Sequence, residues 1–150
     1  MIKGVGKDQE IVTNKNGGKQ SKSIGAFYLL DPDFFYGYFD KYYKLAIPVI
    51  RFMRDNNKAD LANELFYRYP NRLLLVVKTL EEGIERYPMN NWRLIPEESH
   101  LNHALTHLFA AEQGDKQDDH IAHFLTRMMM VIATEKDCNV DNYTAIEKRI

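Results

Sequence analysis

Five prolines divide this 150-residue chain into segments with helical periodicity. A proline is favoured in the first turn of a helix and kinks or stops a helix elsewhere, because it has no backbone N–H to donate. Pro88 closes one apolar segment, Pro96 opens the next, and Gly114 ends the helix that follows. Apolar residues between these stops recur every three or four positions, and no convincing alternation with a period of two indicates a strand. The sequence therefore predicts an all-α fold, a helical bundle.

We expect helices at about residues 32–44, 58–69, 72–87, 97–112 and 118–134. Pro48 either kinks the first of these or opens another that ends near Asp55. The continuous apolar run at residues 73–77 must be well buried. The aromatic residues between 27 and 43 are expected in the core or in a subunit interface, with nucleobase stacking as the alternative.

The first 23 residues are rich in Gly, Lys, Asn and Ser and lack an apolar period. They predict a flexible Gly/Lys-rich N-terminal arm, a loop with a short strand at residues 11–13. Alternatively, the arm is a phosphate-binding loop, in which the N–H groups around Gly17 and Gly18 face an anion and Lys19 and Lys22 add charge. The pattern is not a Walker motif. We expect a single domain over residues 1–150, with residues 136–150 as a frayed tail.

Composition narrows the class of function. Twenty Lys and Arg against 21 Asp and Glu give a formal net charge of −1, which predicts no stable binding to nucleic acid. No stretch of about 18 apolar residues occurs, so we expect no membrane association and a cytoplasmic protein.

The residues suited to chemistry concentrate between positions 79 and 127, where all five histidines lie. Three predicted helices each present one face with reactive side chains at spacings of three or four. These faces carry Glu82 and Glu85, then His100, His103 and His107, and then Asp119, His120, His123 and Arg127. Paired carboxylates suit Mg²⁺ or Mn²⁺, and an arginine beside them suits an anionic substrate. Each residue alone is more often a solvated or core side chain, but their coincidence on adjacent helices favours a functional site.

The ordered motifs resemble the phage and bacterial dATP/dGTP diphosphohydrolase family, which is often linked to the all-α, MazG-like nucleoside triphosphate pyrophosphohydrolases. The resemblance rests on residues 16–21, on Leu-Glu-Glu-Gly-Ile-Glu-Arg-Tyr at 80–87, on Asn91-Trp92, and on the His and Asp pattern from 100 to 127. It covers the N-terminal arm and residues 73 to about 132. Residues 33–70 depart from it and look like an insertion.

The resemblance implies an oligomeric enzyme that uses Mg²⁺, or Mn²⁺, to cleave purine deoxynucleoside triphosphates into the monophosphate and pyrophosphate. The enzyme would act in the cytoplasm, which would be the cytoplasm of the host cell if a phage encodes the protein. Glu82 and Glu85 would be the metal pair, with Glu or His103 as base. The superfamily has a second acidic metal-binding pair, Glu-x-x-Asp, which this chain lacks on the following helix. His100 and His103 occupy the same spacing there, and Asp119 with His123, one helix later, could serve instead. The expected substrate-binding residues are Lys19, Gln20, Lys22, Asn91, Trp92, His107 and Arg127.

Two other functions fit the same residues. One is a non-catalytic helical module in which the histidines bind a structural metal or hold subunits together. The other is a different metal-dependent phosphohydrolase, because His and Asp clusters also serve phosphate-ester cleavage.

Overall fold

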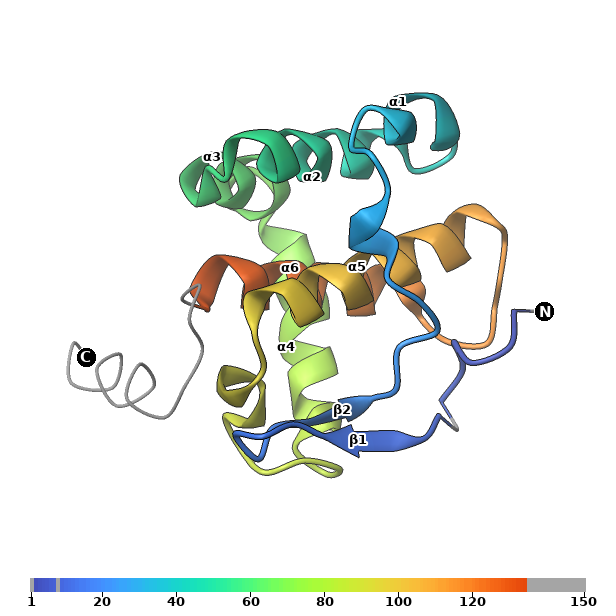
Figure 1. The fold of residues 1–150 in the computed structure, drawn as a ribbon. Helices are drawn as coiled ribbons and strands as arrows, with labels where there is room; N and C mark the ends of the chain where they lie inside the picture. The colour runs from blue at the N-terminus through green and yellow to red at the C-terminus, as the bar shows by residue number, and fades with distance from the viewer. Residues whose placement is uncertain (1, 8, 135–150) are drawn as a thin grey trace.

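The computed structural model describes residues 2–7 and 9–134 and shows an all-α fold with one small β-hairpin (Figure 1). The predicted frayed tail, residues 136–150, lies outside this part of the chain. The elements are β1 (Ile11–Thr13), β2 (Lys19–Ser21), the 3-10 helix η1 (Phe27–Leu29), α1 (Phe34–Tyr38), α2 (Tyr43–Asp55), α3 (Lys58–Ala62), the π-helical turn η2 (Asn63–Tyr67), α4 (Pro70–Gly83), the 3-10 helix η3 (Asn91–Leu94), α5 (Glu97–Glu112) and α6 (His120–Ala133).

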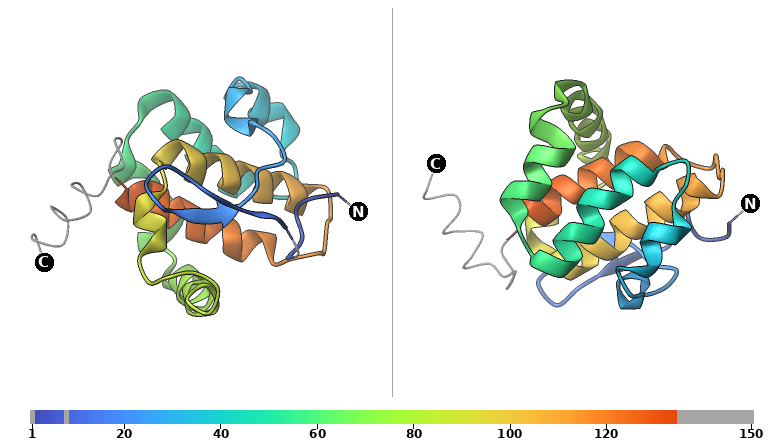
Figure 2. Two further views of the ribbon diagram at one scale, coloured as in Figure 1. Left: turned by 60° about the horizontal axis from the view of Figure 1, so that its bottom comes forward. Right: turned by 90° about the horizontal axis from the view of Figure 1, so that it is seen from above.

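Helices α5 and α6 form the centre of the molecule, and the other elements pack around this pair. Helices α1, α2 and α3 cover one side of the pair, and the hairpin lies on the opposite side (Figure 1). Helix α4 packs on α6 on its way from the α3 side to the hairpin side, and it projects at one side of the α5–α6 pair (Figure 2). None of the helices in the described residues is long and apolar enough to span a bilayer.

The core lies between the α5–α6 pair and the α2–α3 layer. Its largest fully buried apolar side chains come from both layers and include Ile50, Leu61, Leu65, Leu108, Phe124, Leu125 and Met128. Of the predicted helices, α5 and α6 have the boundaries closest to expectation. The acidic first turn of α5 follows Pro96, and Asp119 caps α6 by accepting a hydrogen bond from the Ala122 N–H.

The prediction that residues 73–77 are well buried is wrong. Only Val76 is buried, whereas Leu74 is 60% exposed and Val77 50%. Helix α4 packs mainly on α6, so only one stripe of the helix is covered and the rest of its apolar surface faces solvent. An exposed apolar surface of this kind is typical of a protein interface.

The N-terminal arm folds as an antiparallel hairpin in which Ile11 pairs with Ser21 and Thr13 with Lys19. The expected strand at residues 11–13 is confirmed, the second strand replaces predicted loop, and the predicted flexibility is not confirmed. Gly17 takes the left-handed conformation, with φ of 85°, in the turn between the strands.

The long aromatic helix predicted at residues 32–44 is divided. Helix α1 ends at Tyr38, and the backbone N–H groups of Asp40, Lys41 and Tyr42 then donate to the Glu112 carboxylate at 2.6–3.0 Å. This carboxylate binds the start of α2 to the end of α5. Pro48 lies inside α2, which continues to Asp55.

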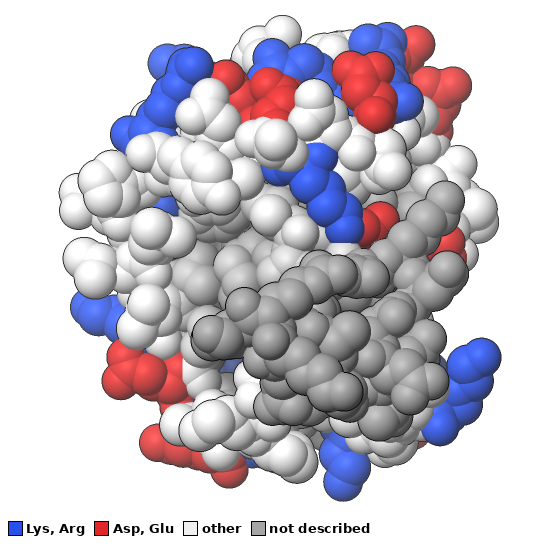
Figure 3. All heavy atoms as spheres, turned by 90° about the vertical axis from the view of Figure 1, so that its left-hand side faces the viewer, with Lys and Arg blue, Asp and Glu red and all other residues white. Residues whose placement is uncertain are grey.

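The surface carries both signs of charge. On the face that Figure 3 shows, basic and acidic side chains of described residues lie close together, most clearly along the upper edge.

Candidate active site

A pocket of about 550 Å³ lies where the turn after α4, strand β2 and the facing sides of α5 and α6 meet. Its volume is in the range of sites for small organic ligands. His100 and His120, from the same predicted helix faces, do not line this pocket, and neither does Asp119. All the other site residues predicted from the sequence line it. They are Lys19, Gln20, Lys22, Glu82, Glu85, Asn91, Trp92, His103, His107, His123 and Arg127. Residues 33–70 contribute nothing to the lining, so the aromatic segment does not shape this pocket.

Arg127 is the cation at the bottom of the pocket, and it is bound by neutral groups. Its Nη1 donates to Gln20 Oε1 and to His100 Nδ1, both at 3.0 Å. No carboxylate among residues 2–7 and 9–134 forms an ion pair with it. Burial lowers the pKa of Arg127 to about 10, so the side chain still carries its charge at neutral pH. Tyr87, which also lines the pocket, is a further electrostatic neighbour of Arg127. The described hydrogen bonds of Arg127 use only Nη1, so Nη2 and Nε can donate to a ligand.

His100 has one possible protonation state in this arrangement. Its Nε2 lies 2.9 Å from the Trp92 carbonyl oxygen, which can only accept, so Nε2 donates. Its Nδ1 accepts from Arg127, which can only donate. Burial and then the Arg127 charge lower the pKa of His100 to about 3. The side chain therefore holds Arg127 and the Trp92 turn in place and is not itself a ligand.

Asn91 has a positioning role that the sequence did not reveal. Its Oδ1 accepts from the Lys19 N–H at 2.8 Å, and its Nδ2 donates to the Lys19 carbonyl oxygen at 2.6 Å. The amide thus pairs with β2 as another strand would. Asn91 lines the pocket, but this pairing uses its side chain to hold the hairpin over the site.

The glycine turn of the hairpin does not bind an anion through its backbone. Asn14 Oδ1 accepts from the N–H groups of Asn16 and Gly18, and the Asn14 carbonyl oxygen accepts from Gly17. Gly18 also packs against the Leu94 backbone, 2.9 Å from where a Cβ would be. The phosphate-loop hypothesis therefore fails for the turn. The arm lines the pocket with other residues, among them Lys19, Gln20 and Lys22.

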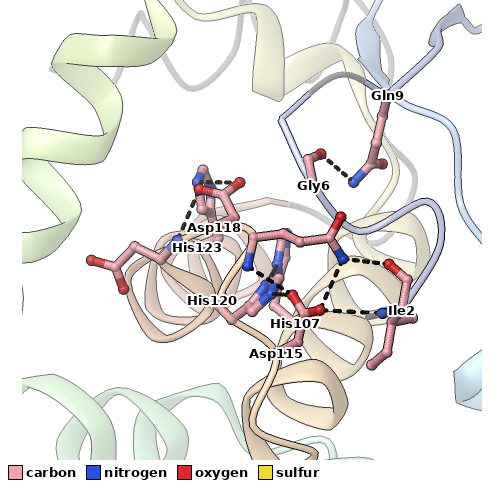
Figure 4. Close-up of polar contacts among 10 residues, drawn as sticks. Ile2, Gly6, Gln9, His107, Asp115, Asp118, His120 and His123 are labelled. Atoms are coloured by element: carbon pink, nitrogen blue, oxygen red, sulfur yellow. Dashed lines mark hydrogen bonds and ion pairs between the residues drawn. The ribbon is translucent and has the colours of Figure 1, made fainter.

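A second group of polar residues lies at the start of α6 (Figure 4). His123 Nε2 is 3.3 Å from Asp118 Oδ2, and its ring stacks on His107 with centroids 5.0 Å apart. Burial opposes ionisation of Asp118, but the hydrogen bond and the charge from His123 lower its pKa to about 2. All three side chains line the pocket.

Behind this group, three side chains form a continuous chain of hydrogen bonds. Asp115 Oδ2 lies 2.6 Å from His120 Nε2, and His120 Nδ1 lies 3.0 Å from His107 Nδ1. The Asp115 and His120 side chains are each 2% exposed. Sequence reasoning gave no role to Asp115 or Asp118. A signal existed, because each aspartate precedes its histidine partner by five residues.

Two histidines of α5 that line the pocket are held neutral. Burial, followed by the charge of Arg127, lowers the pKa of His103 to about 2. Burial and the neighbouring His123 and Arg127 also lower the pKa of His107 well below its ordinary value. Neutral imidazoles can accept a proton or bind a metal, so both remain candidates for chemistry.

The predicted metal ligands are only partly brought together. Helix α4 ends at Gly83, so Glu82 lies in its last turn and Glu85 in the turn beyond, and the two do not share a regular helix face as predicted. Both are exposed on the pocket wall. The Asp119 carboxylate caps α6 outside the pocket. Within the part of the chain that the structure describes, no three His, Cys, Asp or Glu side chains are arranged to enclose a metal ion.

The structure is an all-α fold with a pocket of small-molecule size whose lining includes Arg127, Lys19 and Lys22. A family model of the N-terminal part of dATP/dGTP diphosphohydrolases matches residues 53–142, and the chain belongs to this family. The match includes residues 53–70, which had looked like an insertion, and does not extend to the N-terminal arm. The wider MazG-like relationship stays a prediction. Comparisons with curated proteins and with solved structures gave no match.

Proposed function

We propose that this protein is a metal-dependent pyrophosphohydrolase that converts purine deoxynucleoside triphosphates, dATP or dGTP, into the monophosphate and pyrophosphate. Membership of the dATP/dGTP diphosphohydrolase family supports the substrate class. The observation that carries the proposal is the position of Arg127, a charged guanidinium in a pocket where no described carboxylate neutralises it.

An unpaired cation in such a pocket is costly unless a ligand supplies the opposite charge. Arg127 is fixed by two neutral acceptors that position it without cancelling its charge. Lys19 and Lys22 approach the same pocket from β2 and the segment after it. A triphosphate matches this arrangement, because it offers several anionic oxygens to three separate cations.

Glu82 and Glu85 suit a Mg²⁺ ion that arrives with the substrate. Mg²⁺ is usually bound by one or two carboxylates together with substrate phosphates and water, and seldom by a cage of protein ligands. Two exposed carboxylates on the pocket wall fit this pattern. We assign the metal to Glu82 and Glu85 alone, because Asp119 caps α6 and His123 pairs with Asp118. When bound, the ion would neutralise phosphate charge and orient a water for attack.

The nucleoside would lie toward the turn after α4. Trp92 lines this side of the pocket, and its ring lies 4.3 Å from the Arg93 guanidinium carbon and edge-on to His100. A purine offers a large flat surface for stacking on an indole ring. The phosphates would then extend toward Arg127, Lys19 and Lys22, which stabilise the pyrophosphate as it leaves.

The test is pyrophosphate release from each of the four dNTPs in the presence of Mg²⁺ or Mn²⁺. We expect turnover of dATP or dGTP, and a loss of at least about 100-fold in kcat for Glu82→Gln and Glu85→Gln. Glu81→Gln makes the same chemical change one residue away, at an exposed position that does not line the pocket, and should keep full activity. No turnover of any dNTP by the unaltered protein would refute the proposal.

A further inference from the structure

The hydrogen-bonded chain from Asp115 through His120 to His107 connects a buried carboxylate to the pocket. Asp115 lies in the loop between α5 and α6, His120 is the first residue of α6, and His107 belongs to α5. Figure 4 shows the three side chains joined by hydrogen bonds. Of the three, only His107 lines the pocket. The structure therefore places one end of the chain where a substrate would lie and the other end away from it.

Asp115 determines which nitrogen of His120 carries a proton. The carboxylate also accepts from the Ile2 N–H at 3.2 Å and from the Gln117 backbone and side-chain nitrogens at 3.1 and 2.8 Å. The hydrogen bond from His120, and then those from Gln117, hold the pKa of Asp115 below its usual range, so it is ionised and can only accept. His120 must then donate from Nε2. In the neutral imidazole, Nδ1 is left as an acceptor.

The tautomer of His120 in turn determines the tautomer of His107. His120 Nδ1 and His107 Nδ1 are 3.0 Å apart, so one of them donates to the other. Since neutral His120 accepts at Nδ1, His107 carries its proton on Nδ1. The lone pair of His107 is then on Nε2, on the opposite side of the ring from His120, and Nε2 has no hydrogen bond to another described residue.

The charged neighbours of His107 and of His120 differ. His107 stacks on His123, and His103 and Arg127 line the same part of the pocket, so a positive charge on His107 is disfavoured by burial and by its neighbours. His120 instead lies against the Asp115 carboxylate. The Coulombic attraction of the Asp115 carboxylate for a proton that arrives on His120 gives the relay its direction.

From this geometry we infer that His107 Nε2 is the general base of the reaction, and that His107 and His120 form a two-step proton relay ending beside Asp115. The inference rests on the proposed function. As the water oxygen bonds to the α-phosphorus, the bond from that phosphorus to the pyrophosphate oxygen breaks, and pyrophosphate leaves as the anion. The water proton passes to His107 Nε2, and the Nδ1 proton of His107 passes to His120 Nδ1.

His107 is the catalytic residue of this relay, and Asp115 and His120 are positioning residues. An alternative base such as Glu85 would not need the tautomer that Asp115 imposes. Replacing Asp115 by Asn allows the amide to donate to His120 Nε2, which reverses both tautomers and puts a proton on His107 Nε2. The relay would then lose its acceptor without losing any substrate contact.

The first test is direct observation of the tautomers by long-range nitrogen–proton NMR correlation of the imidazole rings. The spectra should be recorded about two pH units above the ordinary imidazole pKa of ~6.5. Under these conditions His120 should be protonated on Nε2 and His107 on Nδ1. A proton on Nε2 of His107 under these conditions would overturn the inference. The measurement needs no turnover, so its outcome does not depend on the proposed function.

The second test is the kinetics of Asp115→Asn and His107→Gln with dGTP and Mg²⁺. We expect kcat to fall by about 100-fold or more in both while KM changes by less than about threefold. Asp60→Asn, the same change in a partly exposed ion pair with Arg51 away from the pocket, is the control and should match the unaltered protein. Circular dichroism tests whether each variant is folded. If Asp115→Asn does not fold, the NMR measurement on the unaltered protein still decides the inference.

The results separate the two proposals. If the unaltered protein hydrolyses dNTPs and Asp115→Asn retains its kcat, the relay is wrong and the proposed function stands. If the unaltered protein hydrolyses no dNTP, the proposed function fails, and the role of the relay in catalysis fails with it.

Discussion

His100 and Arg127 are joined by a hydrogen bond of 3.0 Å in which the imidazole Nδ1 accepts from the guanidinium. The other nitrogen of the same ring donates to the Trp92 carbonyl oxygen. One fully buried side chain thus connects Arg127, which we propose to bind the phosphates, with the Trp92 turn, which we propose to hold the nucleoside. Its neutral state is a requirement of this geometry.

This bridge predicts different outcomes for two substitutions of His100. Leu removes both hydrogen bonds, whereas Gln can still accept from Arg127 through Oε1 and donate to Trp92 through Nε2. A hydrogen bond to a charged group contributes about 1.5–3 kcal/mol. We therefore expect His100→Leu to raise KM for dGTP by about 10-fold or more and His100→Gln to have a smaller effect. Equal KM values for the two variants would show that the hydrogen bonds of the bridge do not matter.

Arg127→Met is expected to separate binding from stability. Loss of the cation should weaken the binding of a non-hydrolysable dGTP analogue by about 100-fold, as titration calorimetry would measure. The variant should melt no lower than the unaltered protein, because it no longer buries an unpaired charge. Arg51→Met, on α2 and away from the pocket, is the matched control and should bind normally. Unchanged affinity in Arg127→Met would remove Arg127 from the site.

Glu112→Gln tests the junction between α5 and the start of α2. Burial raises the pKa of Glu112, but the N–H groups of Asp40, Tyr42 and Lys41 outweigh this and lower it from its ordinary value of 4.5. Glutamine keeps one acceptor oxygen, so we expect a loss of about 1 kcal/mol in the free energy of unfolding, measured with urea at neutral pH.

The sign of the pH dependence follows from the lowered pKa of Glu112. A carboxyl group of this kind stabilises the fold above its unfolded-state pKa, and the stabilisation is lost as the pH falls through the folded-state pKa. The stability difference between the unaltered protein and Glu112→Gln should therefore shrink below about pH 4. A difference that persists undiminished in acid would contradict this account, and Glu81→Gln should show no difference at any pH.

The exposed side of α4 predicts self-association. Leu74 and Val77 are more exposed than a large apolar side chain normally is in a monomer, and they lie on one helix. We expect light scattering to show a homo-oligomer, and expect Leu74→Glu with Val77→Glu to give monomers. Leu29→Glu, at a position 75% exposed on η1, should leave the oligomer intact. A monomeric unaltered protein would contradict the prediction.

Sequence patterns located α5 and α6 well, because the signals that begin and end these helices are local. Pro96 with two acidic residues opens α5, and an aspartate cap opens α6. Helical spacing also placed the histidines and Arg127 on facing sides of the two helices. The burial of residues 73–77 could not be predicted in this way, because an apolar run does not reveal whether a second layer covers it.

Sequence patterns also could not predict the hydrogen-bond partners in the site, because these partners are far apart along the chain. Asn91 pairs with Lys19, 72 residues away, and Asp115 is held by the backbone of Ile2, 113 residues away. Residue type predicted Asn91 as a ligand for the substrate, which stays a prediction, and the structure adds the tertiary contacts by which its side chain supports the hairpin. The relay likewise depends on how the loop between α5 and α6 folds back.

Phosphorus NMR of the products of a dGTP reaction with Mg²⁺ tests the central claim most directly. The account predicts the signals of dGMP and pyrophosphate appearing together in equal amounts, and their absence with Glu82→Gln. Release of triphosphate or of inorganic phosphate as the first product would show a different phosphohydrolase. A spectrum unchanged for all four dNTPs would contradict hydrolysis altogether.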